Sequence, residues 1–378
     1  MISDRQNLDP NSFESLIQAR IRPDVLAMHA YVVQPATGMV KLDAMENPYT
    51  LSPALQAALG ERLGAVAINR YPGGRVDDLK AALANYVQLP SGHALMLGNG
   101  SDELIDLLHV ACNVPGAVVL APEPGFVMYG MSAQLTGLQY VGVPLQADFA
   151  LDEPAMLAAI AQHRPAITYL AYPNNPTANL WDIAAMTRII AECAAVGCLV
   201  VLDEAYQPFS SSTWLDQIKA HPAQNAHVLL MRTLSKFGLA GVRLGYMLGP
   251  QALIAHIDKV RPPYNVSVLN AECALFALEN SDVFSAQAHD IRGQRAMLFE
   301  ALGRLPGVTP FRSDANMMLM RLQGDAQRAT AVFNAMKARG VLVKNVSKMH
   351  SLLANCLRLT VGTAEENLLM LAALENSL

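Results

Sequence analysis

The chain has 378 residues, more than a single hydrophobic core usually supports, so we expect two domains. Hydrophobic residues make up 52% of the chain and charged residues 16%, a composition that excludes a largely disordered protein. The net charge of −5 and the lack of a basic block argue against nucleic-acid binding, and no uncharged apolar run is long enough to cross a membrane.

The first 30 residues are polar and then weakly helical, and we interpret them as an N-terminal arm. Charges such as Arg5, Asp9 and Glu14 interrupt the segment in which a signal peptide would have its apolar core. The five cysteines form no C-x-x-C motif and lie mostly in apolar runs, as buried reduced thiols do. We therefore expect a cytoplasmic protein without a metal site.

A turn that is rich in glycine follows the first expected strand, 95–97. Gly98 and Gly100 lie in this turn, and Ser101 is placed to cap a helix that extends to about Val114. The free amides and the dipole at such a helix N-terminus attract anions. A capped helix without a ligand fits this stretch equally well.

Strands and helices alternate from about residue 95 to residue 250. The expected strands lie at 95–97, 118–120, 140–143, 167–171, 199–202, 228–231 and 246–248. This alternation predicts an α/β domain with a mostly parallel sheet and crossover helices. Polar residues follow several of the strands, at the sheet edge where open α/β sheets bind their ligands.

The apolar run 228–231 leads through polar residues to a single lysine, Lys236, which small residues follow. A lysine in this position is poorly placed for a solvated charge but well placed to reach a ligand inside the fold. Burial lowers the pKa of an amine, which can then act as a nucleophile or form an imine. A surface loop with an isolated lysine is the alternative.

A second apolar strand ends in Asp203 and Glu204, and Tyr206 follows closely. Pyridoxal phosphate needs a carboxylate at its ring nitrogen, so that the protonated ring can accept electrons, and a hydrogen-bond donor at its phenolic oxygen. Asp203 and Tyr206 suit these two roles. An acid at the carboxyl end of a strand is also common in α/β proteins in general.

The pattern changes after residue 265. A long helical stretch, 267–303, comes first, and Thr363 to Glu366 form a capping box for the last helix. Further strands are expected at 317–322, 341–344 and 357–361. The expected domains are an N-terminal arm with part of the small domain, a large cofactor-binding domain and a small α+β C-terminal domain, at 1–48, 49–265 and 266–378.

Seven short motifs occur in a fixed order between about Tyr31 and Gly362. They are Leu42-Asp43-Ala44-Met45-Glu46-Asn47-Pro48-Tyr49, Tyr71-Pro72, Gly98-Asn99-Gly100-Ser101-Asp102-Glu103, Tyr172-Pro173-Asn174-Asn175-Pro176-Thr177, Asp203-Glu204-Ala205-Tyr206, Ser235-Lys236 and Leu357-Arg358-Leu359-Thr360-Val361-Gly362. Each motif is weak alone, but together they are specific. The chain resembles the fold-type I, pyridoxal-phosphate-dependent aminotransferases, and among them the histidinol-phosphate aminotransferase family.

The resemblance implies a large domain that binds pyridoxal 5′-phosphate and a smaller domain beside it. Lys236 would hold the cofactor as an imine and move the substrate proton. Asp203 would keep the ring nitrogen protonated, and Tyr206 with Asn175 would bond the phenolic oxygen. The cofactor phosphate would be bound by residues that include Gly100, Ser101, Ser235 and Arg243, with Asp102 as a near neighbour. Phe126 would stack on the ring, although a core aromatic is an alternative for that position.

The resemblance also implies a homodimer, in which Tyr49 reaches the phosphate of the neighbouring subunit's cofactor. Arg358 lies in an apolar strand and needs an anionic partner, so it would bind the anionic end of the substrate. Tyr31 and Tyr264 match positions at the substrate entrance, the latter from the partner chain, and Asn316 would line the same wall. The implied reaction, a step of histidine biosynthesis, converts histidinol phosphate and 2-oxoglutarate to imidazole acetol phosphate and glutamate.

Other readings stay open at this point. An aromatic amino acid aminotransferase or a phosphothreonine decarboxylase would keep the same fold and cofactor. A cofactor-binding regulator would need a DNA-binding domain, for which the chain offers no basic region, and a nicotinamide dehydrogenase would need a G-x-G-x-x-G motif. Family members usually have glycine where this chain has Ala178; if that turn needs a positive φ, alanine costs about 1 kcal/mol.

Overall fold

The structure is a computed structural model that describes residues 13–28, 30 and 34–378. The chain divides into two compact units, residues 1–37 and 38–378. The described part of the first unit contains two helices, α1 (Phe13–Arg20) and α2 (Pro23–Leu26). Tyr31, which we expected at the substrate entrance, lies outside the described residues.

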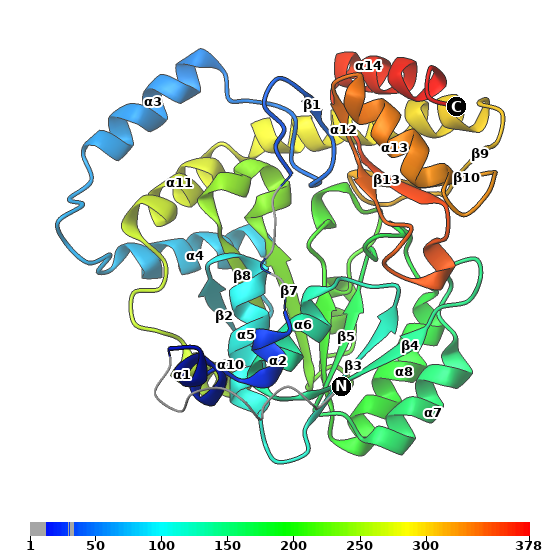
Figure 1. The fold of residues 1–378 in the computed structure, drawn as a ribbon. Coiled ribbons are helices and arrows are strands. Elements are labelled where there is room, and N and C mark those ends of the chain that lie inside the picture. The colour runs from blue at the N-terminus through cyan, green and yellow to red at the C-terminus, as the bar shows by residue number, and fades with distance from the viewer. Residues whose placement is uncertain (1–12, 29, 31–33) are drawn as a thin grey trace. The chain divides into compact units, whose positions relative to one another are not determined.

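A seven-stranded sheet forms the centre of the second unit (Figure 1). Its strands, in spatial order, are β2 (His93–Gly98), β8 (Gly245–Pro250), β7 (Val228–Thr233), β6 (Leu199–Asp203), β5 (Ile167–Ala171), β3 (Val118–Glu123) and β4 (Gln139–Pro144). Only β8 is antiparallel to its neighbours, so the predicted mostly parallel sheet is confirmed. The carboxyl ends of β5, β6 and β7 therefore meet at one edge of the sheet.

Helices cover both faces of this sheet, as a parallel sheet requires. Successive residues of one strand belong to different hydrophobic clusters: Val201 packs with α5 (Gly100–Cys112) and α6 (Met128–Thr136), whereas Leu202 packs with α7 (Glu153–His163) and α8 (Ile183–Val196). Helices α3, α4, α9 and α10 span Pro53–Gly64, Arg75–Val87, Leu215–Ala220 and Gln251–Ile257. The strand alternation thus decides which layer each side chain enters.

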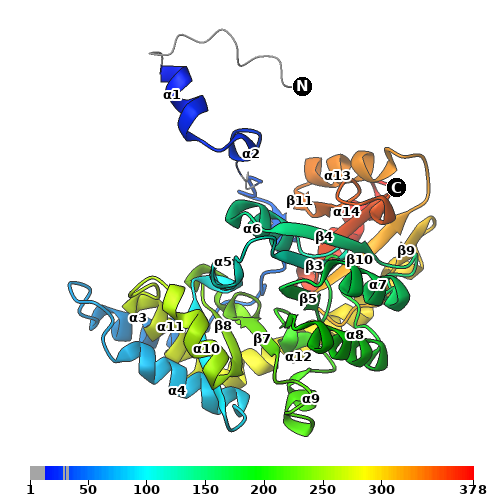
Figure 2. The same ribbon diagram turned by 90° about the horizontal axis from the view of Figure 1, so that it is seen from below.

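The smaller sheet has four antiparallel strands, in the order β12 (Lys344–Asn345), β13 (Cys356–Thr360), β10 (Met317–Leu322) and β9 (Val308–Pro310). Strand β1 (Val40–Lys41) pairs separately with β11 (Val341–Leu342). Helix α13 (Arg328–Ala338) packs against strands of the smaller sheet, and α14 (Ala364–Glu375) packs against α13 and the β1–β11 pair (Figure 2). The capping box at Thr363 and Glu366 is confirmed.

The stretch 267–303 is helical as expected, but it consists of two helices, α11 (Val268–Glu279) and α12 (Ser281–Gly303); α11 packs against α3 and α4, whereas α12 packs against β9 and α14. Two other local expectations differ from the structure. The strand expected at 341–344 is divided between β11 and β12, which pair with different partners. Helix α5 begins at Gly100, so Ser101 lies inside the first turn and does not cap it.

Within the described ranges, no helix is long and apolar enough to cross a membrane, and no group of His, Cys, Asp and Glu could hold a metal ion. All five cysteines have free thiols, and Cys193, Cys198 and Cys356 are buried.

Candidate active site

An open cavity of about 550 Å³ lies at the carboxyl ends of the central strands. Its walls are formed by Met45, Ser101, Asp102, Phe126, Tyr129, Ala171, Pro173, Asn175, Asp203, Ala205, Tyr206, Thr233, Ser235, Lys236 and Arg243. Most residues that the sequence analysis selected for the cofactor are among them. This agreement follows from the topology, because residues far apart in the sequence leave neighbouring strands at the same edge.

Lys236 follows β7 in a π-helical turn, Ser235–Leu239. Its Nζ donates a hydrogen bond to the carbonyl oxygen of Ala44 at 3.0 Å. Burial, together with the positive charge of Arg358, lowers the pKa of the Lys236 amine to about 8. This lowered pKa increases the fraction of the amine that is unprotonated near neutral pH, as a nucleophile or a base requires.

Asp203 is the last residue of β6 and is only 4% exposed. Its Oδ2 accepts a hydrogen bond from the hydroxyl of Tyr129 at 2.7 Å, and its Oδ1 accepts one from the amide of Ala205 at 3.0 Å. Burial raises the pKa of the Asp203 carboxyl to about 6, against the opposing effect of the Tyr129 hydrogen bond. A cation that reached this carboxylate would relieve the cost of its burial.

At the N-terminus of α5, Gly100, Ser101, Ser235 and Arg243 form a cup that could hold an anion. Arg243 donates through Nη1 to Ser235 Oγ at 3.1 Å and through Nη2 to Asp102 Oδ2 at 3.3 Å. A Cβ on Gly100 would lie 2.7 Å from Arg243 Nη2, and a Cβ on Gly245 would lie 2.6 Å from the carbonyl carbon of Gly100. The two glycines thus let the guanidinium and the helix N-terminus approach one another. Because the ion pair with Asp102 is half-exposed and weak, Arg243 can turn to a phosphate.

Arg358 brings a second cation close to the cavity from the smaller sheet, because it bonds the wall residue Asn175 and its charge acts on Lys236. It is 7% exposed, and it donates to Asn175 Oδ1 at 2.7 Å and to the carbonyl oxygen of Asp43 at 2.8 Å. Tyr206 is 5% exposed in the same wall, and burial raises the pKa of its hydroxyl, which keeps it a hydrogen-bond donor. A buried guanidinium is suited to bind a carboxylate or phosphate.

The other selected residues do not line the cavity in this chain. Asn316 is fully buried behind the wall, where its Nδ2 donates to the Met45 carbonyl oxygen at 2.9 Å. It therefore supports Met45, which has a φ of 53° and lines the cavity, while its own Oδ1 has no hydrogen-bond partner in the described chain. Tyr49 packs against the hydrophobic cluster of the smaller sheet. Tyr264 is 56% exposed and stacks on Tyr71, with 4.3 Å between the ring centroids.

Six residues of the cavity wall were not selected from the sequence, namely Met45, Tyr129, Ala171, Pro173, Ala205 and Thr233, and two of them carry hydroxyl groups. Tyr129 lies three residues after Phe126, one helical turn away, and this spacing could have identified it as a neighbour. The hydroxyl of Thr233 lies 3.0 Å from Ser235 Oγ, and their i, i+2 spacing after β7 was the available signal. Ala178 has a φ of 63°, which confirms that its turn needs the left-handed conformation that glycine adopts at no cost.

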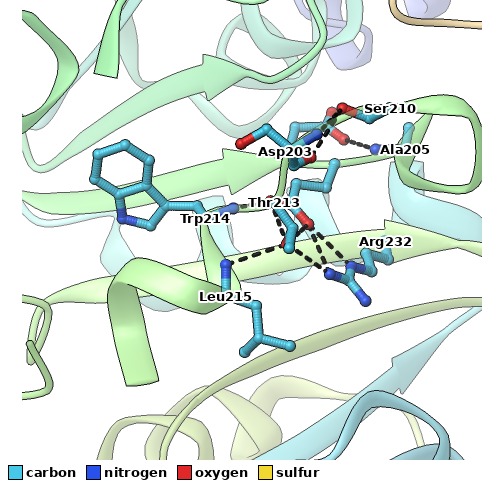
Figure 3. A network of polar contacts seen from close by, with 9 residues as sticks. Asp203, Ala205, Ser210, Thr213, Trp214, Leu215 and Arg232 are labelled. Carbon is cyan, nitrogen blue, oxygen red and sulfur yellow. Dashed lines mark hydrogen bonds and ion pairs between the residues drawn. The ribbon is translucent and has the colours of Figure 1, made fainter. Parts of the chain in front are cut away.

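Thr213, Trp214 and Arg232 lie close together beside the cavity (Figure 3), and Glu204, the residue after Asp203, bonds all three. Glu204 Oε2 accepts hydrogen bonds from Nε and Nη2 of Arg232 at 3.0 and 2.8 Å. The Thr213 hydroxyl at 2.9 Å and the Trp214 amide at 2.5 Å also donate to Glu204. Glu204 and Arg232 are 1% and 6% exposed, so this is a buried ion pair beside the cavity.

Comparisons with known proteins agree with this geometry. The model of the family described as aminotransferase class I and II matches residues 37–374. The histidinol-phosphate aminotransferase of Polaromonas naphthalenivorans (strain CJ2) is 64% identical over the full length of both chains. That of Paracidovorax citrulli (strain AAC00-1) is 66% identical over 95% of this chain and 97% of its own.

A solved structure has the same fold. The crystal structure of histidinol-phosphate aminotransferase from Sinorhizobium meliloti, in complex with pyridoxal-5′-phosphate, superposes with a TM-score of 0.83 at 25% identity. The match covers 95% of this chain and 97% of that one. The fold of the described chain is therefore that of the fold-type I aminotransferases.

Proposed function

The chain belongs to the histidinol-phosphate aminotransferases of aminotransferase class I and II, and from that premise we propose that it transfers an amino group between histidinol phosphate and 2-oxoglutarate. The products are imidazole acetol phosphate and glutamate, and the reaction is a step of histidine biosynthesis. The observation that carries the proposal is the meeting of Lys236, Asp203 and an anion-binding cup in one cavity.

The cavity fits pyridoxal phosphate. The anion cup at Gly100 suits its phosphate, the Asp203 carboxylate suits its ring nitrogen, and the Lys236 amine faces the same space. Phe126 supplies an aromatic wall. When bound, pyridoxal phosphate supplies an aldehyde carbon for an amine and a ring that accepts electrons.

The side chains of this chain then have separate tasks. Asp203 holds a proton on the ring nitrogen through its carboxylate, because its buried charge favours a cation beside it. The Lys236 Nζ, with a pKa of about 8, takes the proton from the reacting substrate carbon and returns it. Tyr206 and Asn175 would bond the phenolic oxygen of the cofactor, and Ser101, Ser235 and Arg243 would bind its phosphate.

Arg358 is proposed to select the substrate. Glutamate and histidinol phosphate differ in shape, but both present an anion that the guanidinium can bind in a fork. At 7% exposure, Arg358 is largely removed from water, which strengthens its attraction for that anion. An incoming anion would replace Asn175 as the partner of Nη1 and free the amide for the cofactor.

We propose a homodimer with shared sites. The stacked rings of Tyr71 and Tyr264 are 76% and 56% exposed, and exposed paired aromatics of this kind are typical of interfaces. Mixing a Lys236→Ala variant with a Tyr49→Ala variant should restore activity in hybrids if Tyr49 completes the partner's site. Because Tyr49 packs in its own chain, a Tyr71→Ala variant is tested in parallel. No recovery in either mixture, with hybrids shown by mass spectrometry, would mean that each site is built from one chain.

The free thiols of the described chain support a reducing compartment, and we propose the cytoplasm.

The test of the function compares three amino donors with 2-oxoglutarate. The kcat/KM for histidinol phosphate should exceed that for histidinol by at least about a hundredfold. With histidinol, the hydrogen-bond donors of the protein that bind the substrate phosphate would be left unpaired. Lys236→Ala should remove turnover with every donor. Equal values for the two donors, or a preference for phenylalanine, would favour an aromatic aminotransferase, and release of carbon dioxide in place of glutamate would favour a decarboxylase.

A further inference from the structure

Asp203 is held by a residue of a neighbouring helix. In the described part of the chain, two donors reach its carboxylate: the Ala205 amide at 3.0 Å and the Tyr129 hydroxyl at 2.7 Å. The amide is part of the turn that follows β6, whereas Tyr129 belongs to α6. Tyr129 is 2% exposed, so it is held almost entirely by its neighbours in the protein.

The ring of Tyr129 is fixed on both sides. It stacks on Tyr169 of β5 with 4.2 Å between centroids and 11° between planes, and Phe126 meets it edge-on at 5.5 Å. Tyr169 is in turn anchored by a hydrogen bond between its hydroxyl and Nε2 of His109 at 3.0 Å. His109 lies on α5 and is fully buried. Tyr169 of β5, which is braced by His109 of α5, and Phe126, which precedes α6, thus restrict the movement of the Tyr129 ring.

We infer that Tyr129 is a positioning residue of the reaction, whose hydroxyl holds Asp203 ionised and aimed at the ring nitrogen of the cofactor. This inference rests on the proposed function, because it assigns Tyr129 a role through the carboxylate that the reaction uses. Tyr129 itself supplies no proton to the substrate. The stack behind it keeps the hydroxyl from following a moving carboxylate.

The electrostatics agree with this geometry. Burial raises the pKa of Asp203, and the negative charges of Asp102 on α5 and of Glu204 in the next position raise it further. The hydrogen bonds from Tyr129 and the Ala205 amide act in the opposite direction, because a donor stabilises the charged form. Loss of the Tyr129 hydroxyl should therefore shift Asp203 toward its neutral form.

The stack offers a matched pair of variants. Tyr129→Phe and Tyr169→Phe each remove one hydroxyl from the same buried column and keep the aromatic ring. Only the first removes a hydrogen bond to Asp203; the second removes the bond to His109. Both variants should lower the melting temperature, so a loss of stability does not distinguish them.

The first measurement is the pKa of Asp203 in the full-length, cofactor-free protein. It is obtained from a pH titration monitored by carbon NMR of labelled aspartate carboxyl groups, in which the Asp203→Asn variant identifies the Asp203 signal. Tyr129→Phe should raise this pKa by about one unit or more, whereas Tyr169→Phe should leave it within a few tenths. The second is steady-state kinetics on the loaded enzyme. Tyr129→Phe should lower kcat by about tenfold to a hundredfold with little change in KM, the range for a hydrogen bond to a charged group.

An unchanged Asp203 pKa in Tyr129→Phe would overturn the inference, and so would equal losses of kcat in the two variants. If Tyr129→Phe did not fold, difluorotyrosine at position 129 would replace it in the test. Its more acidic hydroxyl donates more strongly and should lower the Asp203 pKa. An unchanged Asp203 pKa would again overturn the inference. Failure of the wild-type chain to convert histidinol phosphate would reject the proposed function alone, since the carboxyl titration needs neither cofactor nor substrate.

Discussion

Two adjacent carboxylates at the end of β6 have opposite environments. Asp203 and Glu204 are 4% and 1% exposed, yet Asp203 faces the layer of α5 and α6, whereas Glu204 joins Arg232 in the network beside α9. Glu204 has a cation, a hydroxyl and an amide as partners. Asp203 has only neutral donors among its hydrogen bonds in the described chain.

This difference shows how the surroundings of two neighbouring acids can make one of them stabilise the fold and leave the other available to a ligand. The charge of Glu204 is neutralised within the protein, so it has little to offer to a ligand. The charge of Asp203 is tolerated but not neutralised, and its pKa is raised to about 6. A buried acid without a cation of its own is prepared to bind a cationic group, at a cost to the stability of the empty protein.

The largest expected effect is on turnover. Asp203→Asn should lower kcat by about a thousandfold or more, because a neutral amide cannot hold the ring nitrogen protonated. Pyridoxal phosphate should still bind through the other contacts, which its absorption spectrum after gel filtration would show. Glu204→Gln is the matched control, and its folded fraction should keep kcat within about tenfold of wild type. Near-normal turnover in Asp203→Asn would break the distinction between the two acids.

The second effect is on unfolding. Glu204→Gln should reduce the free energy of unfolding by about 3–5 kcal/mol, because it leaves the Arg232 charge buried and unpaired. Urea titrations of the cofactor-free protein measure this directly. The double variant Glu204→Met with Arg232→Met should lose less than the sum of the two single changes. A loss below about 1 kcal/mol in Glu204→Gln would mean that the ion pair contributes no more to the free energy of unfolding than an exposed one.

The smallest effect concerns the stability of the empty site as pH changes. The folded-state pKa of Asp203, about 6, is above its ordinary value of 3.8, so the unfolded chain releases this proton first. Wild-type stability from this group is therefore lost as pH rises from about 4 to about 6. The cofactor-free Asp203→Asn variant should match wild type below pH 4 and exceed it by about 2–3 kcal/mol above pH 6. A lower stability of the variant at pH 7 would show that Asp203 is a structural acid as well.

Much of the candidate site could be predicted from the sequence, because the parallel arrangement of the strands fixes where the residues that follow them lie. Lys236 and Asp203 each follow an apolar run, and parallel strands bring such residues to one edge whatever the details of their loops. Arg358 was identifiable for a similar reason, as a charge inside the apolar strand β13. The mostly parallel sheet followed from the alternation of strands and helices alone.

Other features depend on packing that the local sequence does not contain. The spacing of apolar residues does not reveal the break at Asn280, because the sequences on both sides of it favour a helix. The two helices are separate because they pack against different elements of the fold. Asn316 was expected at a substrate wall, but its direction is set by the hydrogen bond to Met45, 271 positions earlier. Tyr129 was missed because its role depends on an acid from another strand.

The contact between Gly245 and Gly100 constrains how such an enzyme can be altered. A side chain at Gly245 would collide with the backbone of the helix start, whose atoms cannot turn aside as the end of a flexible side chain can. The main chain of β8 is thus packed directly against the helix start beside the cavity, and positions 100 and 245 leave little room for change. We expect variation in amino-donor range instead around Arg358 and Met45, which are held by side-chain contacts that can be exchanged one at a time. A directed-evolution library would accordingly leave positions 100 and 245 constant and diversify the surroundings of those two residues.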